Sequence, residues 1–341
     1  MSAWERTVDE LLSYRPDAPA RLVVAVCGPK GAGKSTFCRH VTLKSSGALL
    51  LLAADVARPE LTLPGLVSLY RLAPGEERVT LGRIFLGEDS AVQCPVQYLN
   101  ALGELVDLAE QPAFAALPLV VDTMGWGTGL VKNILEALLT RLTPSDVVQI
   151  VPARKMETLG SVLPTGLDAK VWTLEPAVEH RQREAADDVT VHAVALFSEA
   201  RAFCVGLAKI KLTLNAALAE ADLAHEFVLL ALNGAVVGLL NKGSGPRATR
   251  FVGVGLVHLV DRERQLLVVR VPHATAATLA GVDEVVVGSS LIVPPSRFPT
   301  RPSSGTRPYV AMRSHLVGSA EAAQRTEIKR KRLDASLPQT G

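Results

Sequence analysis

The sequence predicts an α/β fold, in which a doubly wound parallel sheet is followed by a smaller C-terminal β-rich domain. In the first half of the chain, short apolar runs rich in β-branched residues alternate with helical patterns, which is typical of parallel strands buried on both faces. Near residue 205 the pattern changes. From there on, runs such as FVLLALNGAVVGLL and FVGVGLVHLV are punctuated by glycine and follow one another with no long helix between them, which favours a β domain.

Five apolar runs are expected to form the parallel strands: Leu22–Cys27, Ala48–Ala54, Pro118–Val121, Val147–Val151 and Val171–Leu174. Helical patterns lie between most of them, at Lys34–Lys44, Pro95–Leu108 and Thr128–Leu142. In such a sheet the ligand binds at the carboxyl ends of the strands. Those ends carry GPKGAGKS, Asp55 and the DTMGWG stretch at Asp122–Gly127, so we expect a site at that edge.

The stretch GPKGAGKS at Gly28–Ser35 fits the phosphate-loop pattern G-x-x-x-x-G-K-[ST] in every fixed position, between an apolar strand and a helix. Its glycines let backbone N–H groups turn toward an anion at the start of that helix. Lys34 is expected to bridge the β- and γ-phosphates, and Ser35 to hold Mg²⁺. We therefore predict a P-loop NTPase that uses ATP and Mg²⁺, with the nucleotide bound by Gly28, Pro29, Lys30, Gly31, Ala32, Gly33, Lys34, Ser35 and Thr36.

The charged segment Glu175–Val189 follows the last predicted parallel strand, where many P-loop kinases carry a lid. Arg181 and Arg183 are its cations, and such an arginine neutralises charge on a transferring phosphoryl group. We predict a lid near 175–190 in which one of these arginines is catalytic; the alternative is a solvated helical surface.

The composition describes a globular chain, with 48% apolar residues and a net charge of +2. No run of eighteen apolar residues occurs and the N-terminus is charged, so we expect a soluble protein that does not associate with membranes. The four cysteines have no C-x-x-C spacing, which argues against zinc and fits a reducing compartment. The basic run IKRKR, which ends at Arg332, matches a nuclear import signal, although such runs are common.

Several stretches together resemble one family: VCGPKGAGKSTFCR, RPELTLPGLVSL, IFLGEDS, LVVDTMGWGTGL, LTPSDVVQI, LALNGAVVGLL and FVGVGLVHLVDRERQLLVVRV. They are similar to the polynucleotide 5′-hydroxyl kinases, in particular the nucleolar branch that acts in ribosomal-RNA precursor processing. The resemblance runs in order from about residue 20 to about residue 310. It implies ATP-dependent phosphorylation of a 5′-hydroxyl on RNA, with DNA as an alternative acceptor. It also implies a location in the nucleus, and within the nucleus in the nucleolus.

The resemblance also assigns the acceptor side of the site. The family carries D-x-D-x-G-Q-P-E after the second strand, where this chain reads AADVARPE from Ala53 to Glu60. Asp55 is therefore expected to activate the 5′-hydroxyl, and Arg58, in place of the glutamine, to contact substrate. Trp126 of the G-W pair is expected to stack on a terminal base, although a Trp buried in the core is the alternative. The predicted metal ligands are Ser35, Asp55 and Asp122.

The predicted organisation has four parts: a helical lead-in at 1–20, a P-loop kinase domain at 21–204 with its lid, a β-rich domain at 205–310, and a basic, flexible tail at 311–341. Larger family members carry a domain ahead of the phosphate loop, which we expect to be absent here or to belong to another chain.

Two other functions compete with the RNA 5′-kinase. Because Ala53 replaces the first acid of the family stretch, the chain could be a degraded kinase retained as an ATP-binding scaffold in an RNA-processing complex. A GTPase switch is disfavoured, since NKGS at Asn241–Ser244 lacks the aspartate of N-K-x-D. The expected partners are an RNA 5′ end and a partner ribonuclease or other processing-complex subunits.

Overall fold

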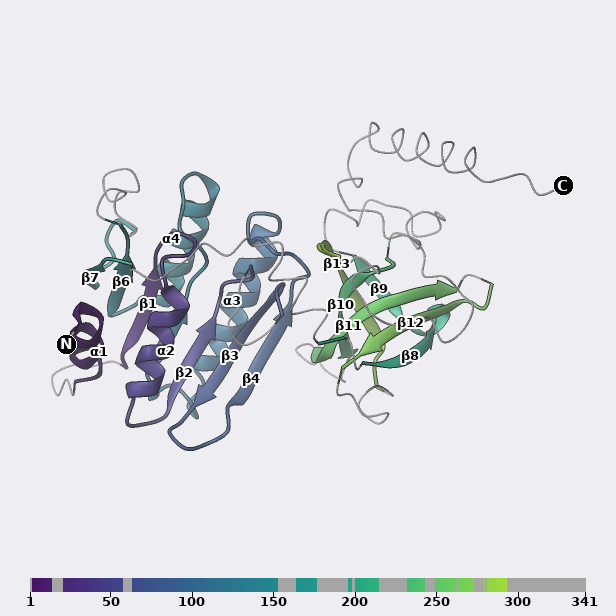
Figure 1. Ribbon diagram of the computed structural model, residues 1–341, viewed down its shortest axis with the longest axis horizontal. Coiled ribbons are helices and arrows are strands. Elements are labelled where there is room, and N and C mark those ends of the chain that lie inside the picture. The colour runs from purple at the N-terminus through teal and green to yellow at the C-terminus, as the bar shows by residue number, and fades with distance from the viewer. Residues whose placement is uncertain are drawn as a thin grey trace. The chain divides into compact units, whose positions relative to one another are not determined.

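The computed structural model describes residues 2–13, 21–57, 63–152, 164–176, 196–197, 200–214, 232–242, 249–261, 263–272, 279 and 281–292. The chain divides into two compact units, Met1–His192 and Ala193–Gly341. Each unit is built around one sheet, and the two sheets share no strand (Figure 1).

The first unit contains a seven-stranded sheet with the order β4-β3-β2-β5-β1-β6-β7. The central strands are β1 (Val23–Cys27), β2 (Leu49–Ala53), β5 (Leu119–Asp122), β6 (Asp146–Ile150) and β7 (Lys170–Leu174). They run parallel to one another. The ends of these strands and of the predicted helices differ from the prediction by one or two residues at most, so the predicted parallel sheet is confirmed.

Two antiparallel strands at the edge of this sheet were missed. They are β3 (Leu66–Leu72) and β4 (Val79–Phe85), which form a hairpin joined to β2 through β3. In β4 the first two residues are exposed, the next four are half-buried and only the last is buried. An uninterrupted apolar run, the pattern used to find the parallel strands, does not occur there. The sheet is therefore mixed, with a parallel centre and an antiparallel edge.

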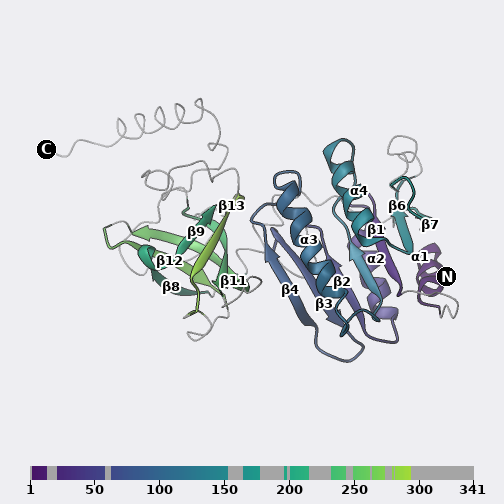
Figure 2. The same cartoon turned by 180° about the vertical axis from the view of Figure 1, so that it is seen from behind.

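Helices cover both faces of the first sheet. Helices α1 (Ala3–Leu12) and α2 (Lys34–Lys44) lie on the face seen in Figure 1, and α3 (Pro95–Ala109) and α4 (Leu130–Leu142) on the other, as Figure 2 shows. Helix α1 begins with a capping box, in which Ser2 Oγ accepts from the Glu5 amide and Glu5 Oε2 from the Ser2 amide. Helix α3 begins at Pro95, and the lack of an N–H there costs no hydrogen bond because the first residues of a helix have no intrahelical acceptor.

The sheet separates two hydrophobic cores. One contains Tyr98 and Leu102 of α3 and Leu135 of α4, packed on side chains of the central strands. The other contains Trp4 of α1 and Phe37 of α2, whose rings meet edge to face at 5.5 Å. Because both faces are covered, every residue of β1, β2, β5 and β6 is buried, which explains why these strands read as continuous apolar runs.

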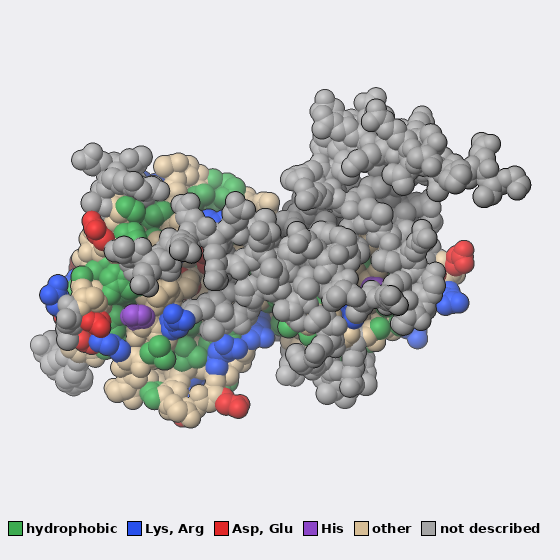
Figure 3. All heavy atoms as spheres, in the orientation of Figure 1, with side chains coloured by type: hydrophobic (Ala, Val, Ile, Leu, Met, Phe, Trp, Pro, Cys, Tyr) green, Lys and Arg blue, Asp and Glu red, His purple; other side chains and the backbone are tan. Residues whose placement is uncertain are grey.

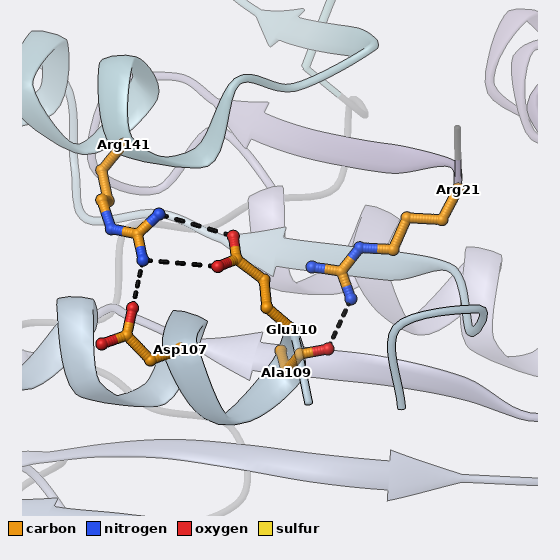
Figure 4. Close-up of polar contacts among 5 residues, drawn as sticks. All are labelled: Arg21, Asp107, Ala109, Glu110 and Arg141. Atoms are coloured by element: carbon orange, nitrogen blue, oxygen red, sulfur yellow. Dashed lines mark hydrogen bonds and ion pairs between the residues drawn. The ribbon is translucent and has the colours of Figure 1, made fainter. Parts of the chain in front are cut away.

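A polar network joins α3 and α4 at the surface of the first core (Figure 4). The Arg141 guanidinium of α4 pairs with the carboxylates of Asp107 and Glu110, at the end of α3 and just beyond it. Arg21, which precedes β1, donates to the Ala109 carbonyl at 2.7 Å. These contacts fix the end of α3 against α4, but Arg141 is 43% exposed, so water and salt screen its ion pairs.

The second unit contains a sheet with the order β8-β12-β11-β10-β13-β9. Its strands are β8 (Arg201–Gly206), β9 (Lys211–Leu214), β10 (Ala235–Lys242), β11 (Thr249–Asp261), β12 (Leu266–Val271) and β13 (Glu284–Ile292), with a short 3₁₀ turn, η1 (Leu207–Lys209), before β9. All neighbours are antiparallel except β13 and β9. Gly255 allows β11 to approach β12, because a Cβ there would lie 2.3 Å from a Val269 methyl group.

Within the part of the chain that the structure describes, none of the helices is long and apolar enough to cross a membrane.

We predict that the two kinds of contact on α4 differ strongly in their effect on stability. Leu135→Ala, which empties a fully buried position, should lower the free energy of unfolding by about 2–5 kcal/mol. Arg141→Gln should lower it by less than about 1 kcal/mol, and less at high salt. Urea unfolding followed by tryptophan fluorescence tests this in the first unit alone, since Trp4, Trp126 and Trp172 all belong to it. Equal losses in the two variants would contradict it.

Candidate functional site

The carboxyl ends of three adjacent parallel strands meet at one edge of the first sheet. In register, Asp122 at the end of β5 pairs with Val26 of β1 on one side and with Ala53 of β2 on the other. The loop Gly28–Ser35 follows β1, and Asp55 lies two residues beyond β2. The structure therefore brings the phosphate loop, Asp122 and Asp55 to the same edge.

The phosphate loop has the backbone geometry that its glycines were expected to provide. Gly31 and Gly33 have φ values of 78° and 99°, in the left-handed region that side chains disfavour. Gly33 is the N-cap of α2, and no side chain caps that helix end. The first N–H groups of α2 therefore open toward the loop, as an anion-binding site requires. Lys34 is 5% exposed, and its Nζ donates to the Pro29 carbonyl across the loop at 3.4 Å.

Gly28 is enclosed by backbone from the end of β6 and from the loop after β5. A Cβ at this position would lie 2.4 Å from the Ile150 carbonyl oxygen at the end of β6, a separation that real Cβ atoms do not show. On the other side, the Gly28 carbonyl accepts a hydrogen bond from the Trp126 amide at 2.8 Å. A Cβ on Gly125 would lie 3.4 Å from the Lys30 backbone. The loop after β5 therefore packs directly against the phosphate loop.

The prediction that Trp126 offers a stacking face is wrong for this conformation. The indole is 4% exposed and belongs to the core between the sheet and α3 and α4. A base has no free face to stack on, so the alternative of a core tryptophan applies. The backbone of Trp126 nevertheless holds the start of the phosphate loop through its bond to Gly28.

Buried polar groups connect β1 and β5 beneath the loop. The Thr123 hydroxyl, fully buried, donates to the Val26 carbonyl at 2.7 Å. Burial raises the pKa of the neighbouring Cys27 thiol to about 12, against the smaller opposing effects of Thr123 and the Lys34 charge. A thiol with that pKa stays protonated at neutral pH and is a poor nucleophile. Cys27 is therefore a small core residue, as its place in an apolar run indicated.

Asp55 is held by a local turn and by its neighbour Ala54. Its Oδ1 accepts from the Ala57 amide at 3.0 Å. Ala54 donates its N–H to the Asp122 carbonyl at 2.9 Å, while its own carbonyl accepts from the Tyr98 hydroxyl, also at 2.9 Å. Both backbone groups of Ala54 are thus fixed, one by β5 and one by α3.

Tyr98 was not predicted as a site residue. It is fully buried on α3, and burial, with the nearby Asp55 and Asp122 carboxylates, raises its pKa well above the ordinary value. The hydroxyl therefore keeps its proton and serves as a permanent donor to Ala54. In the sequence it is one aromatic residue on the apolar face of a helix, a pattern typical of an ordinary core residue.

Glu88 is an acidic residue that the sequence analysis did not single out. It follows β4 at the same edge and is 1% exposed. Its loop is tied to the loop after β2, since Gly65 donates to the Val56 carbonyl and accepts from the amides of Leu86 and Gly87. Burial, and then the Glu88 charge, raise the pKa of the Cys94 thiol to about 12.

Three predicted site residues, Arg58, Arg181 and Arg183, lie outside the described residues. Ser35 and Thr36 are half-buried at the start of α2, and Asp122 is 5% exposed.

A phosphate loop between a buried strand and a helix, with an acidic strand end beside it, defines a P-loop nucleotide-binding protein. Residues 28–197 match the family model for the P-loop of mRNA cleavage and polyadenylation factor CLP1. The chain therefore carries a CLP1-type P-loop domain. This match and the relatives described next confirm the family resemblance predicted from the sequence motifs.

Two of the curated relatives are proteins named polynucleotide 5′-hydroxyl-kinase NOL9. The Drosophila melanogaster protein is 25% identical over 321 residues, covering 81% of this chain and 32% of its own length. The Arabidopsis thaliana protein is 30% identical over 195 residues, covering 52% and 48%. The chain thus spans 32% and 48% of the length of these two relatives. Among solved structures, Clp1p in a wild-type Clp1p–Pcf11p complex shares the fold, with a TM-score of 0.67, 13% identity and coverage of 85% of this chain and 79% of that one.

We predict that Gly28→Ala weakens binding of a nucleoside triphosphate by at least about tenfold, because the loop must shift away from Ile150 to admit a methyl group. The free energy of unfolding should fall by about 1–3 kcal/mol. Titration with a fluorescent ATP analogue measures the first effect. Gly47→Ala is the matched control, since a Cβ there meets nothing within 4 Å. The same nucleotide affinity in both variants would refute this account of Gly28.

Proposed function

We propose that the protein is an ATP-dependent polynucleotide 5′-hydroxyl kinase that phosphorylates RNA 5′ ends in ribosomal-RNA precursor processing. The observation that carries the proposal is the meeting of the phosphate loop, Asp122 and Asp55 at one sheet edge. A kinase needs a triphosphate cradle and an acceptor group side by side, and these residues supply both. The names of the relatives give the acceptor class.

The residues at the edge fit ATP with Mg²⁺. Ser35 and Asp122 offer a hydroxyl and a carboxylate, the hard oxygen ligands that Mg²⁺ prefers. Among the described residues no group of three or more His, Cys, Asp or Glu side chains could hold a metal ion. That suits an ion held mainly by phosphates and water with one or two protein ligands. When bound, Mg²⁺ neutralises charge on the β- and γ-phosphates. Asp55 is less suited than Ser35 and Asp122 to bind the ion, because its Oδ1 already accepts a hydrogen bond from the Ala57 amide.

The chain's own residues then account for the transfer step. The 5′-hydroxyl oxygen forms a bond to the γ-phosphorus, the bond from that phosphorus to the bridging β–γ oxygen breaks, and ADP leaves. Asp55 accepts the hydroxyl proton, and the turn closed by Ala57 holds its carboxylate in place. Lys34, whose bond to Pro29 is long at 3.4 Å, can turn to the γ-phosphate and stabilise the charge that develops there. Arg58 and a lid arginine, Arg181 or Arg183, stay predicted contacts to the acceptor and the transferring group.

The scaffold alternative rests on position 53. Ala53 pairs with Asp122 in register, so the missing carboxylate would have stood beside the acid nearest the phosphate loop. A chain with an intact phosphate loop and a weakened acceptor side would bind ATP without transferring phosphate.

We also infer a nuclear, nucleolar location and partners among RNA-processing subunits. The location rests on the IKRKR run and the family resemblance, and imaging a fluorescent fusion with and without residues 329–332 tests it. The four-part organisation with a lid near 175–190 likewise stays a proposal.

The proposed activity is tested by incubating the full chain with γ-labelled ATP, Mg²⁺ and a 5′-hydroxyl RNA. We expect label on the RNA 5′ end, and Lys34→Ala should abolish it because the charge that reaches the γ-phosphate is lost. A matched RNA that already carries a 5′-phosphate should take up no label. Undiminished transfer by Lys34→Ala would reject the assignment of the phosphate loop.

Asp55 separates the kinase from the scaffold. Asp55→Asn should keep ATP affinity and lower transfer by about 10²–10⁴-fold, the usual range for a lost general base. Ala53→Asp, which restores the family's carboxylate beside Asp122, should be tolerated or raise the rate. If the wild type transfers nothing and Ala53→Asp does, the scaffold proposal is correct. Robust transfer by Asp55→Asn would mean that another group takes the proton.

A further inference from the structure

A cluster of unpartnered hydrogen-bond donors lies on the β3–β4 hairpin, on the face of the sheet that carries α2. The side-chain atoms Ser68 Oγ, Tyr70 Oη and Arg83 Nε are all buried, and none has a hydrogen-bond partner in the described part of the chain. Ser68 pairs with Arg83 across the hairpin, and Tyr70 lies two residues beyond Ser68, so the three side chains share one face. Buried polar groups are nearly always paired, so three together indicate a missing ligand.

Two guanidinium groups complete this cluster. The Cζ atoms of Arg78 and Arg83 lie 5.2 and 5.6 Å from the centroid of the Tyr70 ring. Neither arginine forms an ion pair with any residue that the structure describes, whereas Arg71 on the same hairpin pairs with Glu76 at 2.7 Å. Two like charges held near one ring repel each other, and an anion between them would offset that repulsion. Figure 3 shows Lys and Arg side chains gathered over β3 and β4 on this face.

The cluster is continuous with the candidate active site. Ser68 pairs with Ala53 on β2, and Ala53 pairs with Asp122 on β5. A single row of residues therefore runs from Arg83 through Ser68 and Ala53 to the acid beside the phosphate loop. With neighbouring strands about 4.8 Å apart, β4 lies about 14 Å from β5, close enough for a strand whose 5′ end is at Asp55 to cross the hairpin.

We propose that Arg78, Arg83, Tyr70 and Ser68 form a phosphate-binding site for the acceptor RNA, a few nucleotides from its 5′ end. A backbone phosphate bridges the two guanidinium groups and accepts from Arg83 Nε and the Tyr70 hydroxyl. Arginine forks suit phosphate oxygens, and a contact to the backbone positions the strand without reading its sequence. The proposal rests on the proposed function for its ligand, because that function supplies a single-stranded polynucleotide at this edge.

Salt-dependent binding of RNA tests the site. The probe is a single-stranded 5′-hydroxyl RNA labelled at its 3′ end, titrated with the full chain without ATP and followed by fluorescence anisotropy at several salt concentrations. In the double variant Arg78→Gln, Arg83→Gln the affinity should fall by about tenfold, and the slope of log K against log salt should shrink by about 0.7, the value for one phosphate contact on a single strand. Arg6→Gln removes one positive charge from an exposed position on α1 and should change neither quantity.

Tyr70→Phe is the second variant and guards against a folding artefact. It removes only a buried hydroxyl that has no partner, so thermal stability without RNA should be unchanged or higher. RNA affinity should nevertheless fall, because the phosphate loses a donor. A variant that is as stable as the wild type and binds RNA less tightly shows that the hydroxyl serves a ligand. Unchanged affinity in both Tyr70→Phe and the arginine double variant would overturn the site.

Phosphorylation of a 5′-hydroxyl dinucleotide, too short to reach β4, separates this site from the proposed function. The arginine double variant and Tyr70→Phe should both phosphorylate the dinucleotide at the wild-type rate. Normal transfer to the dinucleotide with undiminished RNA binding in the variants would refute the site and leave the kinase intact. Weakened RNA binding in the variants, with no transfer by the wild type, would support the site and refute the kinase. A wild type that does not bind the RNA would overturn the site as an RNA contact.

Discussion

The close approach of Gly28 to the Ile150 carbonyl is the constraint on which the candidate site depends. Strand β1 leaves the sheet between β5 and β6, and a side chain at Gly28 would collide with the end of β6. With only hydrogen there, the chain can turn at once into the phosphate loop. The Trp126 amide holds the same residue from the β5 side. The phosphate loop is therefore positioned by β1, the end of β6 and the loop after β5, which fixes its N–H groups before any nucleotide arrives and lowers the entropic cost of binding.

A second fixed point controls the position of Asp55, the residue proposed to act on the acceptor. Ala54 has no functional side chain, yet its N–H is bonded to β5 and its carbonyl to the Tyr98 hydroxyl of α3. Asp55 comes directly after it, so any movement of α3 relative to the sheet would move the carboxylate. The Arg141 network fastens the far end of the same helix. Tyr98 and Arg141 thus act at opposite ends of α3. The buried hydrogen bond from Tyr98 to Ala54 lies next to Asp55, whereas the exposed ion pairs of Arg141 are more sensitive to salt.

The sequence indicated the parts of the site that local chemistry determines. Gly28–Ser35 is recognisable because the residues that shape the loop are also those that bind phosphate, and β1 and α2 flank it directly. Residues that depend on register were missed. Ser68 and Arg83 are fifteen positions apart in a chain whose hairpin was not predicted, and only the pairing of β3 with β4 makes them neighbours. The sequence offered the burial of Trp126 only as an alternative, since a glycine-rich loop does not indicate whether its aromatic ring turns toward water or toward the core.

The replacement at position 53 links the two halves of this edge. An aspartate at position 53 would stand between Asp122 and Ser68 in the row that ends at Arg83. It would add a negative charge on β2, the strand next to both Asp122 on β5 and Ser68 on β3. With alanine, 6% exposed, the row carries a carboxylate at its β5 end and, at its β4 end, a guanidinium that forms no ion pair with any described residue, with no charge between them. If an RNA strand follows this row as proposed, electrostatic complementarity requires the positive end to stay free for phosphate, while the acidic end would be available to the proposed Mg²⁺. In the proposed kinase, the loss of one acid would weaken the activation of the hydroxyl but would leave more net positive charge along the path by which an RNA 5′ end would approach Asp55.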